Sequence, residues 1–498
     1  MTVIAPPAVS RAALSSFTSA IDPIGNARRF IAQVRADGIA MIDLRFVDLL
    51  GAWHHVTLPT SALDEDVFTK GVAFDGSSIP GFKTVQGGDL VAIPDLATAL
   101  ADPFWEQPTV GLICSIAEAD THEPFAHDPR TVASRAEAFL RAQGIAEKSM
   151  WGPEFEFYIF DRITYLNDIN QSQYRIDSCE ADWNTGAVEG RNLGGHIPRK
   201  GGYHAMPPLD ALYNLRSEMV RRIEDAGIPV RYHHHEVGGP GQCEIEIMLL
   251  PLERAVDAVM LVKYLTKMVA RMADKTVTYM PKPLYNEAGS GMHFHQYLVQ
   301  AGKSQFYEKG PYANLSKMAR QYIGGLLKHG PALLALTNPA TNSYKRLVPG
   351  FEAPVSLCYG LANRSAAVRV PKYVDTDTDK RIEFRTPDGT CNPYLAVAAQ
   401  LMAGIDGILN DLDAEKLGFG PVDGNLFDLP VEERARIGKM PASLREAAQA
   451  LEADHEFLLR GGVFPAEMIQ NLIRLKLKDY DEVRNRPHPF EMSLYFDS

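Results

Sequence analysis

The chain has 498 residues, of which 46% are hydrophobic and 22% are charged, a balance typical of a globular protein with a sizeable core. This composition excludes a disordered chain, a collagen-like fibre and a small disulfide scaffold. The net charge of -12, from 62 acidic and 50 basic residues, argues against nucleic acid as the main partner.

The N-terminal residues and the cysteines indicate the cellular location of the protein. Residues 1–25 lack a basic region followed by an apolar block, so we expect a flexible leader and no secretory signal. No stretch approaches the roughly 20 consecutive apolar residues of a membrane span, so no membrane partner is expected. Five scattered cysteines without CxxC spacing argue against zinc fingers and disulfides and favour a cytoplasmic location.

The predicted elements begin with a short amphipathic helix at Asn26–Asp37. A strand pair follows within Ile39–Pro59, and then a glycine-rich, irregular stretch at Gly71–Gly88. The proline-containing run Asp120–Arg130 has little periodicity and marks a domain boundary. We therefore expect an N-terminal domain at residues 26–128 and a C-terminal domain at residues 129–498.

Beyond this boundary, strand-like segments alternate with long helical ones. The predicted helices are Asp210–Gly227, Leu252–Asp274, Leu315–His329 and Asn392–Leu409. A polar, glycine-rich loop at Thr185–Gly202 suits the mobile edge of an active site.

Four strand-like segments combine acidic, imidazole and guanidinium side chains with apolar ones. Glu154 and Glu156 alternate with apolar residues in the sequence EFEF, and alternate side chains of a strand share a face. By the same rule, His293 and His295 share one face of a second strand.

The third segment places Arg381, Glu383 and Arg385 on one face, and the fourth is a hairpin whose turn brings Glu236 close to Glu244. Each strand alone also fits a half-buried sheet with a wet outer face. However, Glu, His and Arg dominate all four segments, whereas ordinary outer faces mix in Lys, Thr and Ser. If the sheet curves around a cavity, five glutamates and one histidine converge there.

Such a cluster of carboxylates needs positive counter-charge, because packed like charges raise one another's pKa. Ligands of this kind, without thiolates, favour Mg²⁺ or Mn²⁺. Six ligands divide into two sites of three, and two cations beside several arginines suit phosphoryl transfer. No GxxxxGK[ST] motif is present, so this is not a P-loop enzyme.

Further arginines occur in loop-like or strand-end contexts: Arg346, Arg364 and Arg369. Surface ion pairing explains each of them equally well. Because the guanidinium fork matches carboxylate and phosphate, the alternative is that they hold an acidic substrate and a phosphate.

These motifs together resemble bacterial type I glutamine synthetases across about Gly25 to Ser498. The matching motifs, in order, are FDGSS (Phe74–Ser78), GPEFEF (Gly152–Phe157), KGGY (Lys200–Tyr203), HHHE (His233–Glu236), GSGMHFH (Gly289–His295), TNPATNSYKRLVPGFEAP (Thr337–Pro354), NRSAAVRVP (Asn363–Pro371) and RIEFRTPD (Arg381–Asp388). The resemblance implies an α+β fold, with a small N-terminal β-grasp domain and a large catalytic domain of a curved antiparallel sheet and packed helices. It also implies a homo-dodecamer of two hexameric rings with active sites between subunits.

The resemblance assigns roles to particular residues. One Mg²⁺ or Mn²⁺ would be held by Glu156, Glu236 and Glu244, and the second by Glu154, His293 and Glu383. The residues expected at L-glutamate are Gly289, Arg346, Arg364 and Arg385. The residues expected at ATP are His295, Arg369 and Arg381, with Arg364 also at the transferred phosphoryl group. Asp75 of a neighbouring subunit and Glu352, on a flap, would bind ammonium and take its proton.

The implied reaction begins when ATP phosphorylates the γ-carboxylate of L-glutamate, which converts a poor leaving group into a good one. Deprotonated ammonium then attacks the γ-glutamyl phosphate, giving L-glutamine, ADP and phosphate. Closure of the Glu352 flap would keep water from the intermediate.

Three positions depart from the family pattern. Phe427 replaces the tyrosine that adenylylated members carry in NLYDLP, which predicts a member of the non-adenylylated subgroup. Ala288 replaces an asparagine beside the glutamate-contacting glycine, and Tyr297 replaces a small residue near the nucleotide.

Two other functions compete. A ligase that joins glutamate to a polyamine or to ethanolamine would tend to lose an acid of the ammonium pocket, but Asp75 and Glu352 are both present. A catalytically inactive assembly protein would lose metal ligands, but all six are present. The apolar C-terminal run Pro487–Phe496 is expected to dock into the facing ring.

Overall fold

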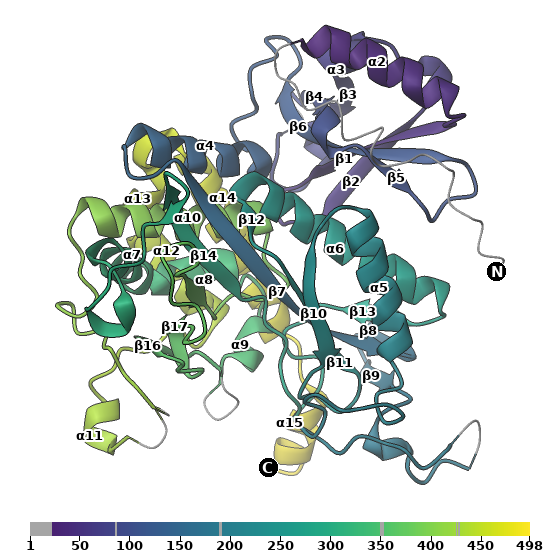
Figure 1. Ribbon diagram of the computed structural model, residues 1–498. Helices are drawn as coiled ribbons and strands as arrows, with labels where there is room; N and C mark the ends of the chain where they lie inside the picture. The colour runs from purple at the N-terminus through teal and green to yellow at the C-terminus, as the bar shows by residue number, and fades with distance from the viewer. Residues whose placement is uncertain (1–21, 85–86, 189–191, 349–352, 425, 427–428) are drawn as a thin grey trace.

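The computed structural model describes residues 22–498 except 85–86, 189–191, 349–352, 425 and 427–428 (Figure 1). Most of the expected leader therefore lies outside the described residues. Helix α2 (Pro23–Ala36) begins inside the expected leader and three residues before the predicted helix. Asp22 explains this early start, because its side chain accepts a hydrogen bond from the Gly25 N–H and Pro23 fits the first turn.

The N-terminal part is a sheet with the order β2-β1-β6-β4-β3, and β5 pairs with β6. Its strands are β1 (Met41–Val47), β2 (Trp53–Pro59), β3 (Val72–Asp75), β4 (Asp89–Pro94), β5 (Leu100–Asp102) and β6 (Thr109–Glu118). The strand pair predicted within Ile39–Pro59 is confirmed as β1 and β2. Helix α2 buries Phe30 and Val34 in the same core as Ile42 and Leu44 of β1, so the helix covers this sheet.

The second sheet is larger and has the order β10-β11-β7-β14-β18-β17-β16. These strands are β7 (Lys148–Phe160), β10 (Val230–His235), β11 (Gln242–Ile247), β14 (Phe294–Gln300), β16 (Ser356–Leu361), β17 (Ala366–Val370) and β18 (Ile382–Phe384). Three short strands pair beside this path: β12 (Leu250–Pro251), β13 (Thr276–Thr278) and β15 (Lys303–Ser304).

This second sheet is antiparallel as predicted, except that β16 and β17 are parallel. The exception arises because the chain turns at Ala362, where φ is 57°, and runs back before β17 begins. A second turn follows just before β17, where the Asn363 side chain accepts hydrogen bonds from the N–H and the hydroxyl of Ser365.

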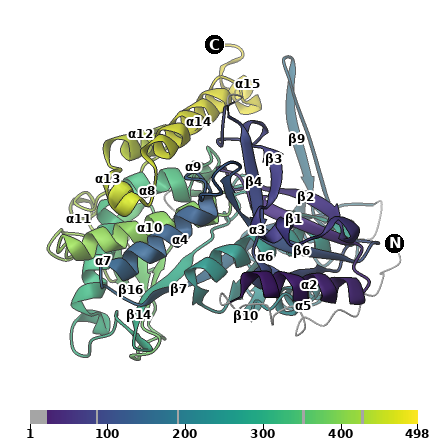
Figure 2. The same ribbon diagram turned by 90° about the horizontal axis from the view of Figure 1, so that it is seen from above.

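Helices cover the apolar face of the second sheet. The helices after α2 are α3 (Asp66–Thr69), α4 (Pro129–Ala142), α5 (Tyr213–Asp225), α6 (Leu252–Met272), α7 (Lys317–Lys328), α8 (Gly330–Thr337), α9 (Ser343–Arg346), α10 (Pro393–Leu409), α11 (Val431–Arg434), α12 (Leu444–Ala453), α13 (Glu456–Leu459), α14 (Ala466–Arg484) and α15 (Pro489–Tyr495). All four predicted helices are present within a few residues, as α5, α6, α7 and α10. Helix α10 lies between α4 and α7, which explains why nearly all its side chains are buried (Figure 2).

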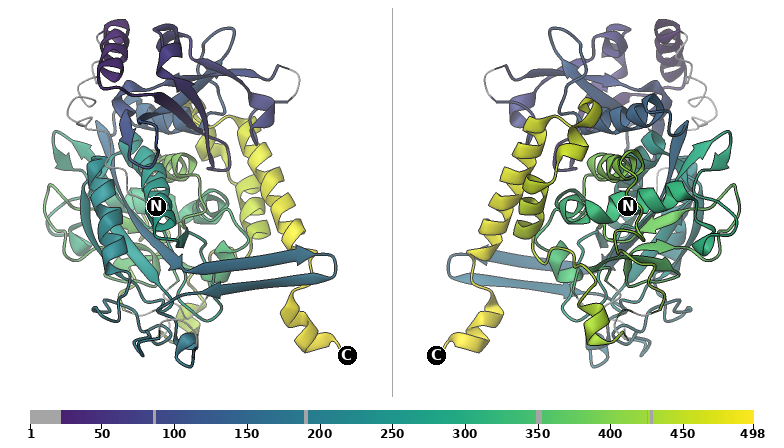
Figure 3. Two further views of the ribbon diagram at one scale, coloured as in Figure 1. Left: turned by 90° about the vertical axis from the view of Figure 1, so that its right-hand side faces the viewer. Right: turned by 90° about the vertical axis from the view of Figure 1, so that its left-hand side faces the viewer.

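Two elements project from the body. The hairpin of β8 (Arg162–Asp168) and β9 (Gln171–Asp177) is exposed along its length, and α15 extends beside it (Figure 3). Helix α15 leaves Phe490 and Leu494 more than half exposed. Among the described helices, none combines the length and the apolar character needed to cross a bilayer.

Candidate functional site

Strand β7 shows which face of the second sheet carries the site. Phe155 and Phe157 are fully buried in the core with the helices, so the alternate residues Glu154 and Glu156 face the other side of the sheet. Both carboxylates are largely buried, at 7% and 9% exposed. The strand therefore carries two acidic side chains into a space that other strands complete.

The first acidic group consists of Glu156, Glu236 and Glu244, whose nearest oxygens all lie within 4.8 Å of one another. Burial raises the pKa of Glu236 to about 9, and the carboxylates of Glu156 and Glu244 add to this effect. Burial and neighbouring glutamates likewise hold the pKa of Glu244 well above its usual range. The raised pKa values mean that the described residues supply too little positive charge to keep these carboxylates ionised, which is the condition that a bound cation relieves.

The second group consists of Glu154, His293 and Glu383, which also lie within 4.8 Å of one another. His293 Nδ1 is 3.1 Å from Glu154 Oε2 and 3.6 Å from Glu383 Oε1. Burial alone would raise the pKa of Glu383, but the guanidinium groups of Arg385 and Arg369 outweigh it and lower the pKa to about 2. Burial opposes ionisation of Glu154 too, but the imidazoles of His295 and His293 hold its pKa below the usual range. Glu154 and Glu383 are therefore held in the anionic form that a cation requires of its ligands.

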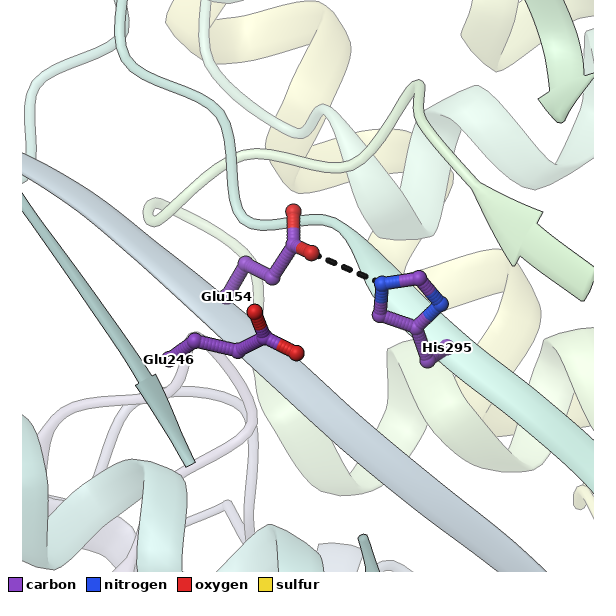
Figure 4. A group of neighbouring side chains, drawn as sticks. All are labelled: Glu154, Glu246 and His295. Carbon is purple, nitrogen blue, oxygen red and sulfur yellow. Dashed lines mark hydrogen bonds and ion pairs between the residues drawn. The ribbon is translucent and has the colours of Figure 1, made fainter. Parts of the chain in front are cut away.

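A third group was not predicted from the sequence and consists of Glu154, Glu246 and His295 (Figure 4). His295 Nε2 is 2.7 Å from Glu154 Oε1. Glu246 Oε2 is buried and accepts no hydrogen bond from the residues described in the structure. Sequence reasoning missed Glu246, although it has the same strand parity as Glu244 and that spacing was the available signal.

A cavity of about 240 Å³ adjoins the first group. It is lined by Glu156, Lys200, Glu236, Val237, Gln242, Ala288, Gly289, His293, Arg346, Ala353 and Arg385. Six of these were predicted site residues. A cavity with acidic groups at one end and two arginines in its wall suits a small acidic substrate.

Arg346 and Gly289 form one wall of this cavity. Arg346 Nη1 donates to the Thr386 carbonyl oxygen at 2.8 Å, and Nη2 donates to the Arg385 carbonyl at 3.2 Å. These bonds fix the guanidinium group, and burial lowers its pKa. A side chain at position 289 would meet Arg346 Cγ at 2.7 Å, so only glycine allows this close approach.

The other predicted arginines lie along β17 and β18. Arg385 Nη1 is 2.7 Å from Glu383 Oε1, and Arg369 pairs with the other oxygen of Glu383. Arg381 directly precedes β18, and its buried Nε donates no hydrogen bond within the described part of the chain. Arg364 is exposed in the loop before β17, and its carbonyl accepts a hydrogen bond from Arg385 Nε at 3.1 Å. Arg369 and Arg385 thus both pair with Glu383 of the second group.

Asp75, which is expected at ammonium, does not line this cavity in the single chain. Asp75, at the end of β3, is exposed and accepts hydrogen bonds from the hydroxyls of Ser77 and Ser78, which lower its pKa. Glu352 lies outside the described residues, as does Phe427. Of the two other departures, Ala288 lines the cavity and accepts a hydrogen bond from the Tyr158 hydroxyl through its carbonyl, at 2.7 Å.

Comparison with known proteins decides the family. Residues 126–495 match the family described as glutamine synthetase, catalytic domain, and residues 38–119 match the glutamine synthetase β-grasp domain. The chain belongs to the glutamine synthetase family. Its fold is therefore a β-grasp domain followed by a catalytic domain with a curled sheet and helices.

Relatives match over nearly their whole length. A glutamine synthetase from Frankia alni is 48% identical over 467 residues, which cover 93% of this chain and 98% of that protein. One from Nostoc sp. is 45% identical over 472 residues, covering 94% and 98%. The solved structure of Plasmodium falciparum glutamine synthetase superposes with a TM-score of 0.84 at 26% identity, covering 94% of this chain and 98% of that one.

Proposed function

We propose that this chain is a glutamate–ammonia ligase, which uses ATP to join ammonia to the γ-carboxylate of L-glutamate and releases L-glutamine, ADP and phosphate. The observation that carries this proposal is that two groups of acidic and imidazole side chains form beside a cavity with two arginines in its wall. The similarity to glutamine synthetases over nearly the full chain supports the same activity.

Two Mg²⁺ or Mn²⁺ ions are the proposed cofactors. Glu156, Glu236 and Glu244 would hold one ion, and the ligands of the second would be Glu154, His293 and Glu383. The donor set fits hard divalent cations, because it is almost entirely carboxylate oxygen and the first group lacks its own counter-charge. When bound, the ions would neutralise negative charge on the transferring phosphoryl group.

L-Glutamate would occupy the 240 Å³ cavity. Arg346 and Arg385 would pair with its carboxylates, the tight backbone at Gly289 would admit its amino group, and Arg364 would contact the reacting end. ATP would lie on the side of His295, Arg369 and Arg381. The guanidinium groups would orient the γ-phosphate for attack by the γ-carboxylate, and the acyl phosphate then has a good leaving group.

Ammonium would be bound and deprotonated by Asp75 and Glu352, with Arg364 stabilising the departing phosphate. Since Asp75 does not line the cavity of its own chain, it would come from a neighbouring subunit. We propose a homo-dodecamer of two hexameric rings, in which the exposed apolar side chains of α15 dock into the facing ring.

We further propose how the enzyme is regulated, where it is located and how its domains divide. Phe427 has no hydroxyl, so the enzyme belongs to the subgroup that is not controlled by adenylylation there. The five cysteines form no disulfide, which supports the cytoplasm as its location. The domains divide at residues 26–128 and 129–498, after a flexible leader at residues 1–25.

A coupled assay of ADP release tests the activity. The purified chain is given ATP, L-glutamate, Mg²⁺ or Mn²⁺, and either ammonium, putrescine or ethanolamine. We expect ADP release with ammonium and glutamine as the product. ADP release with putrescine or ethanolamine but not with ammonium would instead establish a γ-glutamyl-amine ligase.

A further inference from the structure

Three arginines surround the ring of Tyr373. Arg231 lies on β10, Arg369 on β17, and Arg381 just before β18, and their Cζ atoms are 5.3, 5.8 and 5.7 Å from the ring centroid. In the order of the sheet, β10 is an edge strand and four strands separate it from β17. The sheet is therefore curled enough to bring guanidinium groups from distant strands to one tyrosine.

The chain balances the charges of these arginines only in part. Arg231 Nη1 is 2.6 Å from Glu246 Oε1, and Arg369 pairs with Glu383. The Nε atoms of Arg369 and Arg381 are buried and donate no hydrogen bond to any residue that the structure describes. Three like charges around one ring repel one another, and the ring faces offset this repulsion only modestly. A polyanion bound here would neutralise the positive charge of the cluster.

The cluster is also open to a ligand. Tyr373 is 53% exposed, and the Arg231 side chain is about one third exposed. The carboxylates that hold the arginines belong to the acidic groups of the site: Glu383 lies in the second group and Glu246 in the third. The glutamate cavity has Arg346 and Arg385 in its wall and none of these three arginines. The cluster thus adjoins the second and third groups through Glu383 and Glu246 and does not line the glutamate cavity.

We propose that Arg231 is a further nucleotide-binding residue, and that Tyr373 holds it beside Arg369 and Arg381 so that the three arginines bind the triphosphate of ATP. This inference rests on the proposed function and adds two residues to it. Guanidinium groups suit phosphate oxygens because their donors form planar forks. Glu246 accepts a hydrogen bond from Arg231 Nη1 and so orients the guanidinium group. The ring of Tyr232 also packs against this group, with its centroid 5.3 Å from Arg231 Cζ.

The test compares the binding of adenosine, AMP, ADP and ATP at fixed Mg²⁺ by isothermal titration calorimetry. For Arg231→Gln we expect ATP to bind about ten- to a hundredfold more weakly, since a hydrogen-bonded charge is lost. The loss should shrink from ATP to AMP and vanish for adenosine. Arg231→Lys keeps the charge without the fork and should fall between the wild type and Arg231→Gln. Unchanged ATP affinity in Arg231→Gln, or an equal loss for adenosine and ATP, would overturn the proposal.

Three further variants separate a phosphate contact from indirect effects. Replacing Arg231 alone leaves the Glu246 carboxylate without its partner, so the double variant Arg231→Gln/Glu246→Gln also removes that carboxylate. ATP binding should stay weak in the double variant. Recovery of wild-type affinity would contradict a direct contact between Arg231 and phosphate. Tyr373→Leu should weaken ATP binding about threefold or more, because it removes the ring that the arginines share. Arg221→Gln, at an exposed ion pair on α5, is the matched control and should bind ATP like the wild type. A wild-type protein that binds no ATP would instead refute the proposed function.

Discussion

Two clusters of charged side chains in this molecule differ in whether their positive and negative charges balance. Arg130, at the start of α4, is paired with Asp95 at 2.7 Å and with Asp257 of α6 at 3.0 Å. Burial alone would lower the pKa of Arg130, but these carboxylates outweigh it and raise that pKa well above its usual range. The cluster joins the N-terminal sheet to α6 and holds its own counter-charges.

The group of Glu156, Glu236 and Glu244 has the opposite character, because its acids crowd together without enough cations. Folding alone gives no reason to keep such a group, since unpaired buried charge costs free energy. The pairing of Arg130 is explained by folding alone, whereas the excess of acids at Glu156, Glu236 and Glu244 indicates a missing cation. The following predictions test that distinction.

The largest effect is expected for Glu236→Gln, which removes one proposed metal ligand. Activity should fall about a thousandfold or more, because several kcal/mol of charge stabilisation are lost. The metal-free variant should nevertheless melt at a higher temperature than the wild type near pH 8. The reason is that the raised pKa of Glu236 makes folding less favourable as the pH rises from 4.5 towards about 9, and glutamine does not titrate.

Steady-state kinetics and differential scanning calorimetry without metal measure the two effects. Wild-type turnover of the variant would contradict a role for Glu236 in metal binding. A variant that is inactive and also less stable without metal would show that Glu236 has a structural role instead.

Arg130→Met should lower the stability of the protein but leave metal binding intact, which is the reverse of the effects expected for Glu236→Gln. Removing one partner leaves Asp95 and Asp257 without their counter-charge, so the free energy of unfolding should fall by about 3 to 5 kcal/mol. Urea unfolding measures this loss, and metal binding at temperatures well below the melting point should be unchanged. A variant as stable as the wild type would contradict the structural role of this cluster.

Added metal should stabilise the incomplete group selectively. At a Mn²⁺ concentration about 100 times the Kd, the wild type should gain about 2.7 kcal/mol for each independent site. Glu236→Gln should gain less, whereas Arg130→Met should gain as much as the wild type. Thermal melting with and without Mn²⁺ measures these gains, and equal gains in all three proteins would count against binding at Glu236.

The smallest effect concerns His329, another buried group with complete pairing. Its Nδ1 is 2.8 Å from Asp454 and its Nε2 is 3.0 Å from Asp406. Burial alone would lower the pKa of His329, but hydrogen bonds to both carboxylates outweigh it and raise the pKa. Its contribution to stability is therefore complete below the unfolded value of 6.5 and is lost as the pH rises through the higher folded value.

His329→Gln should accordingly cost about 2 kcal/mol near pH 6 and clearly less near pH 9. Urea unfolding at the two pH values measures the difference. A cost that grows with pH would show that His329 stabilises the fold as a neutral side chain.

The parts that the sequence predicted well are those governed by local periodicity. The alternation of Glu154 and Glu156 with phenylalanines correctly indicated which side chains share a face of β7. The four long helices followed from their spacing of apolar residues. The six proposed metal ligands could be grouped by resemblance to a known family, and the structure brings each group of three together.

The features that escaped prediction depend on the path of the chain in three dimensions. Arg231 and Tyr373 are 142 positions apart in the sequence, and only the curling of the sheet brings them into contact. Glu246 had the right parity, but the strand pattern could not reveal that it would face His295 of β14. The start of α2 was placed too late because the cap at Asp22 is a local contact, not a periodic pattern.

Titration of the metal-free protein with Mn²⁺ by isothermal calorimetry tests the central claim most directly. We predict saturation at two Mn²⁺ per chain, with one ion lost in Glu236→Gln and the other lost in Glu383→Gln. No saturable binding, or the same stoichiometry in both variants and the wild type, would show that these carboxylates do not gather around metal ions.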